Sequence, residues 1–190
     1  MRFLLFLAVL LLNFNISAEA SPNLVVGLPM PIEQINSSMS TVQKRVRESA
    51  VRVLTTGGGH GSGSYVVYKD MHLVFTAQHV SDGVYGSKYQ ILKGSETKIG
   101  TLIWSDAAAD IAILRLDEEF VTISPMKWNP QTRMAEVGSK ITYSGYPSSH
   151  KLMTFEGIVS GYENKQGVGK QIILNTYGWF GCSGSVIYAS

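Results

Sequence analysis

Short apolar runs of strand length, separated by glycine or polar turns, dominate the sequence from residue 50 onward. They are rich in Val, Ile, Tyr and Thr, a composition typical of β-strands. No long stretch shows a helical period, apart from a short possible helix at 42–50. This pattern predicts an all-β chain folded as a barrel or sandwich. The runs are 50–54, 64–69, 73–77, 88–92, 98–104 and 111–116, followed by 140–144, 153–162, 171–176 and 185–188.

A mixed segment at 117–138 divides these runs into a set of six and a set of four, and is expected to be a connector. The domain is therefore predicted at 41–190, with a first barrel at about 46–117 and a second at about 136–190. A chain of 190 residues, 45% of them apolar, can bury one sizeable core or two small ones that share an interface. Residues 21–40 contain three of the six prolines and no sustained period, which indicates a linker or N-terminal arm.

The N-terminus has the layout of a secretory signal peptide at 1–20. Arg2 precedes ten consecutive apolar residues, and Ala-Glu-Ala at 18–20 forms a small-x-small cleavage site. Ten residues are too few for a membrane span, which needs about 20. We therefore expect a secreted or periplasmic protein with no stable membrane insertion after signal cleavage.

Charge and cysteine usage narrow the class of protein further. A net charge of +2 gives no support for a nucleic-acid partner. The basic cluster at 44–47 is followed by Glu48 and is expected to be a solvated face. Cys182 is the only cysteine, so no internal disulfide can form and the fold must be held by packing.

Three stretches carry residues suited to nucleophilic catalysis. His79 ends a strand in FTAQHV, Asp110 directly precedes the strand at 111–116, and Ser183 lies beside Cys182 in GWFGCSGS. A serine hydroxyl needs an imidazole to accept its proton, and the imidazole needs a buried carboxylate to fix its tautomer. A tight glycine turn would aim the N–H groups of Gly181 and Ser183 at one oxyanion.

The order of these residues along the chain excludes two families. The α/β-hydrolase motif G-x-S-x-G fails because residue 185 is serine, and no His, Asp or Glu follows Ser183. A subtilisin-like order would leave only Asp70 before His79, in a chain that lacks α/β alternation. The order that remains is His79, Asp110, Ser183.

In this order the sequence resembles the trypsin/chymotrypsin-like serine proteases, most of all their disulfide-free bacterial, HtrA-like branch. The resemblance covers about 42–190 and rests on seven segments taken together. It implies a chymotrypsin-like double β-barrel, with His79 and Asp110 from the first barrel, Ser183 from the second, and the site in the cleft between them. The segments are 46–54, 61–67, 74–80, 110–116, 137–147, 157–161 and 181–185.

The resemblance also implies roles for single residues. Glycine follows Ser183, as it follows the nucleophile in the family, so Ser183 rather than Cys182 is the expected nucleophile. Asp110 is preferred over Asp106 as the acid because the alternating strand begins directly after it. Tyr177 occupies the position at the base of the S1 specificity pocket. His60 is expected to be a loop residue, and no metal or cofactor is required.

Two departures from the family bear on activity. Cys182 stands where zymogen-type relatives carry an aspartate, so we expect no trypsin-style activation. The sequence ends at Ser190, where the family has two further strands, so we expect a second barrel that is C-terminally incomplete. The expected function is exported serine endopeptidase acting on polypeptides. The alternatives are a catalytically silent binding module, or a fragment whose second barrel is completed by a missing hairpin or a partner chain.

Overall fold

A computed structural model describes residues 38–81, 84–127 and 134–189. The predicted signal peptide at 1–20 and nearly all of the predicted arm at 21–40 lie outside these ranges. Within them, no helix is long and apolar enough to cross a membrane. The elements are α2 (Thr41–Ser49), β1 (Ala50–Leu54), β2 (His60–Tyr68), β3 (Met71–Thr76), α3 (Gln78–Ser81), β4 (Lys88–Lys93), β5 (Glu96–Asp106), β6 (Ile111–Leu116), β7 (Met126–Lys127), β8 (Lys140–Gly145), β9 (Met153–Lys165), β10 (Gly169–Asn175) and β11 (Tyr188–Ala189).

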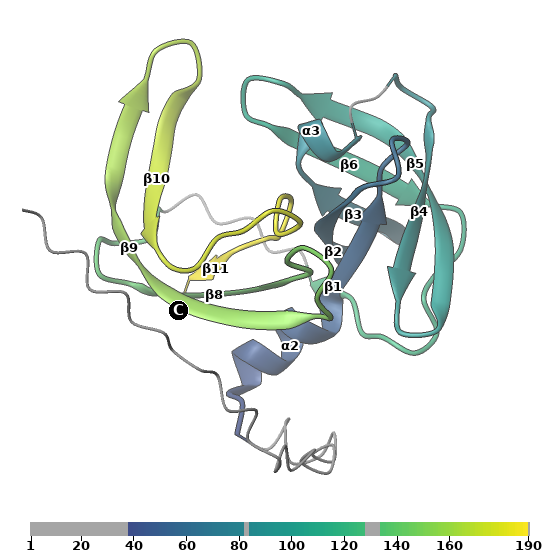
Figure 1. Ribbon diagram of the computed structural model, residues 1–190, viewed down its shortest axis with the longest axis horizontal. Coiled ribbons are helices and arrows are strands. Elements are labelled where there is room, and N and C mark those ends of the chain that lie inside the picture. Colours follow the sequence, from purple (N-terminus) through teal and green to yellow (C-terminus); the bar gives the residue numbers. More distant parts are fainter. Residues whose placement is uncertain (1–37, 82–83, 128–133, 190) are drawn as a thin grey trace, which may run out of the picture.

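Strands β1 to β6 close into a barrel. Their order in the sheet is β1-β4-β5-β6-β3-β2, and β1 also pairs with β2, which joins the two ends (Figure 1). Alternation along β6 shows how a strand supplies the interior: Ala112 and Leu114 are fully buried while Ile111 and Arg115 are exposed. The all-β prediction and the six strands of the first barrel are confirmed.

The second unit is a four-stranded antiparallel sheet in the order β10-β9-β8-β11. Its core is small and is built from Ile141, Tyr143 and Val159, against which Phe155 and Leu174 pack. Strands β10 and β11 form its two edges within the described part of the chain. Figure 1 shows the β9–β10 hairpin rising beside the first barrel, with β8 and β11 below.

The predicted helix is α2, and it lies at the junction of the two units. Ser40 caps it, because its side chain accepts from the Gln43 N–H while the Gln43 side chain accepts from the Ser40 N–H. The expectation that 44–47 is a solvated face is wrong for two of its residues. Val46 is buried, and the Arg47 guanidinium donates to the Leu152 carbonyl at 3.1 Å, because the helix packs against the second sheet.

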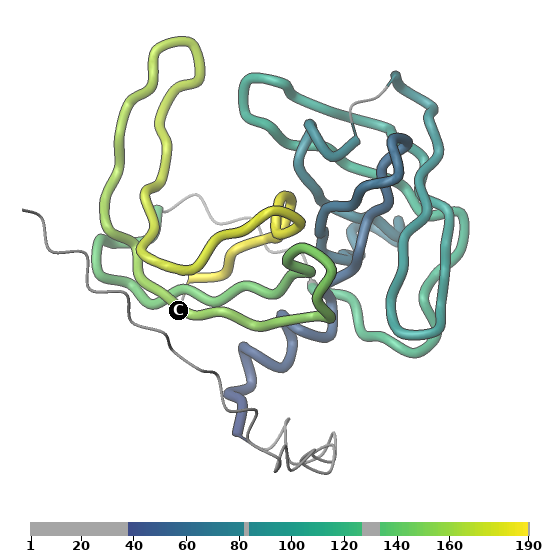
Figure 2. The backbone as a smooth tube through the Cα atoms, in the orientation of Figure 1, coloured from purple at the N-terminus to yellow at the C-terminus, as the bar shows by residue number. Residues whose placement is uncertain are grey.

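Two further expectations need correction. The connector at 117–138 contains a short strand, β7, which pairs in parallel with β2. His60 is the first residue of β2 rather than a loop residue, because it pairs with Leu54 across the β1–β2 ladder. The trace in Figure 2 shows the segment between β10 and β11 reaching across to the first barrel, close to β2. This segment carries Ser183.

Candidate active site

His79 and Asp110 form a tight pair at one rim of the first barrel. His79 lies on α3, directly after β3, and Asp110 lies directly before β6, the strand that pairs with β3. Both Asp110 oxygens lie within hydrogen-bond distance of His79 Nδ1, at 2.8 and 3.0 Å, and Oδ1 also accepts from the His79 backbone N–H at 3.0 Å. The carboxylate thus fixes both the ring and the backbone of the histidine, and it leaves Nε2 free to face a nucleophile.

Asp110 rather than Asp106 faces the histidine. The Asp106 carboxylate caps its own turn, accepting from the N–H groups of Ala108 and Ala109. Asp110 has a positive φ of 54°, a backbone conformation that costs a non-glycine residue about 1–3 kcal/mol and that is concentrated at functional sites. The expectation of a buried carboxylate is wrong: the Asp110 side chain is 47% exposed and that of His79 is 56% exposed, because none of the described strands covers this rim.

The loop at 178–185 is fixed to the first barrel by Ser62. The Ser62 N–H donates to the Ser183 carbonyl at 2.7 Å, and the Ser62 hydroxyl donates to the Gly181 carbonyl at 2.6 Å. The same hydroxyl accepts from the Tyr146 N–H at 2.9 Å. Sequence reasoning missed Ser62, which gives no signal of its own because its partner Gly181 lies 119 residues away.

Two glycines allow the loop to approach the barrel. Gly184 has φ +87°, and a Cβ there would lie 2.3 Å from the Ser62 carbonyl oxygen. Gly181 has φ +89°, and a Cβ there would lie 2.3 Å from the Tyr146 carbonyl oxygen. Only glycine satisfies both the backbone conformation and the space at these positions.

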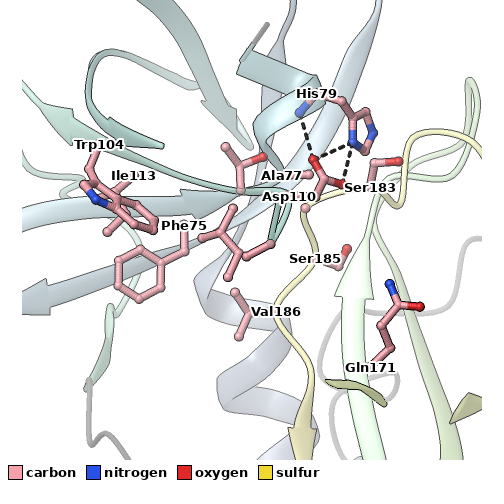
Figure 3. A pocket seen from close by; sticks show the side chains of 14 residues that line it. Phe75, Ala77, His79, Trp104, Asp110, Ile113, Gln171, Ser183, Ser185 and Val186 are labelled. Atoms are coloured by element: carbon pink, nitrogen blue, oxygen red, sulfur yellow. Dashed lines mark hydrogen bonds and ion pairs between the residues drawn. The ribbon is translucent and has the colours of Figure 1, made fainter. Parts of the chain in front are cut away.

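One cavity of about 780 Å³ brings together His79, Asp110 and Ser183. Figure 3 shows Ser183 beside the His79 ring, with Gln171 of β10 on the opposite side of the cavity. No hydrogen bond joins Ser183 to His79 within the described residues, and such bonds are commonly loose before substrate binds. The wall away from the pair is apolar and is formed by Phe75, Trp104, Ile111, Ile113 and Val186.

The N–H groups proposed for the oxyanion hole have no backbone acceptor in the described part of the chain. Among 178–185, the hydrogen bonds formed by backbone N–H groups are those from Cys182 to the Trp179 carbonyl and from Ser185 to the Cys182 carbonyl, both at 3.0 Å. The N–H groups of Gly181 and Ser183 are therefore left for another acceptor. Developing negative charge on a substrate oxygen would be such an acceptor.

Cys182 and Tyr177 face a second, smaller cavity of about 290 Å³ behind Ser183. Burial raises the pKa of the Cys182 thiol above its usual range. Tyr177 is half exposed and stacks on Phe155, with ring centroids 5.0 Å apart. Its backbone carbonyl accepts from the hydroxyl of Tyr143, which also lines this cavity.

His60 lies beneath the loop rather than in the cavity. Its Nε2 is 2.8 Å from the Tyr146 carbonyl oxygen, and it sits next to Gly181. Within the described ranges, no group of three or more His, Cys, Asp or Glu side chains is arranged to hold a metal ion.

Comparison with solved structures shows the same fold. A crystal structure of Rv3671c protease in an inactive form matches with a TM-score of 0.61 and 17% identity, covering 83% of this chain and 78% of that chain. A second structure of Rv3671c, from M. tuberculosis, is an inactive form with a serine-to-alanine substitution; it gives 0.59 and 16%, covering 77% and 72%. A crystal structure of Deg5 gives 0.62 and 18%, covering 84% and 82%. No curated protein matches the chain by sequence.

The sequence profile of the trypsin-like peptidase domain matches residues 61–190. This range includes His79, Asp110 and Ser183, and it spans more than half of the chain. With the barrel and the loop arranged as described, the chain belongs to the trypsin-like peptidase family of serine proteases.

Proposed function

We propose that this protein is an exported serine endopeptidase in which His79, Asp110 and Ser183 act as a catalytic triad through an acyl-enzyme. The observation that carries the proposal is the shared cavity, in which a carboxylate-bound imidazole lies beside a serine on a glycine-shaped loop. Membership of the family makes a polypeptide the expected substrate.

In the acylation step, Ser183 Oγ attacks the scissile carbonyl carbon while His79 Nε2 takes the hydroxyl proton. The carbonyl oxygen becomes an oxyanion that accepts from the Gly181 and Ser183 N–H groups. Each such donor is worth about 2.7–4 kcal/mol of transition-state stabilisation. The protonated His79 then gives its proton to the leaving amine as the peptide C–N bond breaks, and an ester to Ser183 remains.

In the deacylation step, His79 Nε2 takes a proton from a water molecule that attacks the ester carbonyl. The second oxyanion collapses, the bond to Ser183 Oγ breaks, and His79 returns its proton to that oxygen. Throughout, Asp110 stays ionised, stabilises the imidazolium and keeps the proton of the neutral ring on Nδ1.

The environment of Cys182 supports Ser183 as the nucleophile. A reactive cysteine needs a lowered pKa, because the thiolate is the attacking species. Burial has the opposite effect here and keeps the Cys182 sulfur a neutral thiol near pH 7. The sulfur packs against the small core of the second sheet, in the role of an apolar side chain.

Substrate selection and completion of the second barrel form part of the same proposal. Tyr177 would contact the substrate side chain, since it lines the cavity adjoining Ser183.

Strands β10 and β11 are sheet edges among the described residues, and an unpaired edge is a template for another strand. A partner chain adding strands there would complete the second barrel and cover the exposed rim of Asp110.

The test is labelling of the purified full chain with a fluorophosphonate probe, beside Ser183→Ala and Cys182→Ala. We expect labelling of the wild type and of Cys182→Ala, and its loss in Ser183→Ala. A folded wild-type protein that is not labelled would refute activity of this chain alone, and would favour a silent binding module or a requirement for a partner.

N-terminal sequencing of protein recovered outside the cytoplasm would test cleavage after Ala20.

A further inference from the structure

A third cavity, of about 640 Å³, lies between the two units and shares no lining residue with the cavity of His79. Four of its lining side chains are basic, contributed by three separate stretches of the sequence, and none is an acid. Arg47 comes from α2, Arg52 from β1, Lys93 from the end of β4, and Lys151 from the segment between β8 and β9.

Most of the donors of these cations lack a charged partner. Arg47 uses Nη1 to reach the Leu152 carbonyl and the Thr154 hydroxyl, at 3.1 and 3.2 Å, and Arg52 uses Nη2 to reach the His150 carbonyl at 2.8 Å. None of the four cations forms a salt bridge with a described carboxylate. Arg52 Nε is buried and has no hydrogen-bond partner in this part of the structure, although a guanidinium carries five donors.

No described carboxylate pairs with Arg47, Arg52 or Lys151 of this cavity, and the charge on Lys93 is reduced by its surroundings. Burial, and after it the neighbouring Arg47, lower the pKa of Lys93 to about 7, while Glu48 acts in the other direction. Burial also lowers the pKa of Arg47. The Lys93 ammonium is held against the C-terminal end of α2, where it donates to the Arg47 and Ala50 carbonyls. Partly buried charges without counter-charges are costly, and an anionic ligand would supply the counter-charge that the described residues lack.

We propose that this cavity binds a small anion carrying several phosphate groups, with Arg52 and Lys151 donating to it directly. Arginine forks match phosphate oxygens in a bidentate manner, and the stacked Arg52, whose Cζ lies 4.8 Å from the Tyr146 ring centroid, is already fixed in place. The volume falls within the range of small-molecule sites, about 300–1,000 Å³, and exceeds the needs of a single phosphate.

The test is isothermal titration calorimetry of the full chain with inorganic tripolyphosphate, with inorganic monophosphate, and with sodium chloride at matched ionic strength. We expect saturable binding of tripolyphosphate at about 0.15 M salt, weaker binding of phosphate, and none in the chloride control. Vesicles containing a phosphorylated lipid headgroup form a further arm. Saturable binding to these vesicles that is lost in Lys151→Ala and Arg52→Gln would identify the ligand as a phosphorylated lipid headgroup. Binding of tripolyphosphate without binding to the vesicles would identify it as a free anion in solution.

Matched variants distinguish binding in this cavity from a general attraction of the anion to positive charges on the protein surface. Lys151→Ala removes an exposed cation of the cavity and Lys140→Ala removes an exposed cation of β8 outside it. We expect Lys151→Ala and Arg52→Gln to weaken binding at least about tenfold each and Lys140→Ala to change it less than twofold. Equal losses in Lys151→Ala and Lys140→Ala, or no binding by the folded wild type, would overturn the proposal. Because the readout is binding, it is independent of the proposed protease activity.

Discussion

Replacing Asp110 by asparagine tests the central contact of the proposed triad without changing its shape. In the structure the Asp110 oxygens face two donors of His79, its backbone N–H and its ring Nδ1–H. An asparagine has one acceptor oxygen and one NH₂ group. If the oxygen stays on the backbone N–H, the NH₂ group faces Nδ1, and the ring proton must move to Nε2.

The alternative orientation of the asparagine is worse. It would place the NH₂ group against the His79 backbone N–H, two donors facing each other, at a cost of about 1–3 kcal/mol for the unsatisfied group. The variant therefore holds His79 in the tautomer that cannot accept the Ser183 proton. For triads of this kind the loss in rate is about 10⁴-fold, which corresponds to about 5.5 kcal/mol of activation free energy.

The assay is the rate of fluorophosphonate labelling of Asp110→Asn, with Asp106→Asn as the matched control. Asparagine tolerates the positive φ of this position, so the melting temperature should stay close to that of the wild type. Asp106 accepts only from its own turn, so its variant should keep the wild-type labelling rate. A labelling rate for folded Asp110→Asn within tenfold of the wild type would refute the tautomer argument.

Three further outcomes are expected. Gly184→Ala should lose about 2–5 kcal/mol of unfolding free energy and all labelling, because its Cβ would lie 2.3 Å from the Ser62 carbonyl oxygen at φ +87°. The control Gly178→Ala places its Cβ in open space and should lose neither. Denaturant titration measures the two stabilities, and equal values would contradict this prediction. Cys182→Ala should keep the labelling rate within about threefold, and the wild-type thiol should react with iodoacetamide at pH 8 more slowly than free cysteine; fast alkylation would contradict its burial. Lys93 has a pKa of about 7 in the folded state against about 10.4 when unfolded, so between these pH values the unfolded state holds more protons. The unfolding free energy of the wild type should therefore rise with pH in this range, by up to about 1.4 kcal/mol per pH unit, relative to that of Lys93→Met. Parallel pH profiles of the two proteins would refute this prediction.

The strands were predictable because their alternation is local. The limits of β1 and β6 match the apolar runs at 50–54 and 111–116; in β6 every second residue is buried, and in β1 the same spacing joins Val51 and Val53. Strand β7 and helix α3 were missed because elements of two and four residues are too short to show any period. Their conformation is set by the neighbours against which they pack.

The residues of the candidate site were predictable in part, because His79, Asp110 and Ser183 each stand in a local motif. What surrounds them was not. His60 looked like part of a glycine-rich turn, and its contact with the Tyr146 carbonyl joins residues 86 apart. The exposure of Asp110 and the gathering of cations around Arg52 depend on how the two units face each other, which no local pattern records.

The bonds from Ser62 to the carbonyls of Gly181 and Ser183 have a consequence for the order in which the molecule is assembled. The barrel that carries Ser62, His79 and Asp110 is built from the N-terminal half of the described chain, and chains emerging from the ribosome fold their N-terminal parts first. The loop with the nucleophile is made later and takes its shape only by docking on β2, through contacts that span 119 residues. In the proposed mechanism, a nascent or half-unfolded chain would hold His79 and Asp110 together before the Ser183 loop is shaped, so activity would appear only after the whole chain has folded.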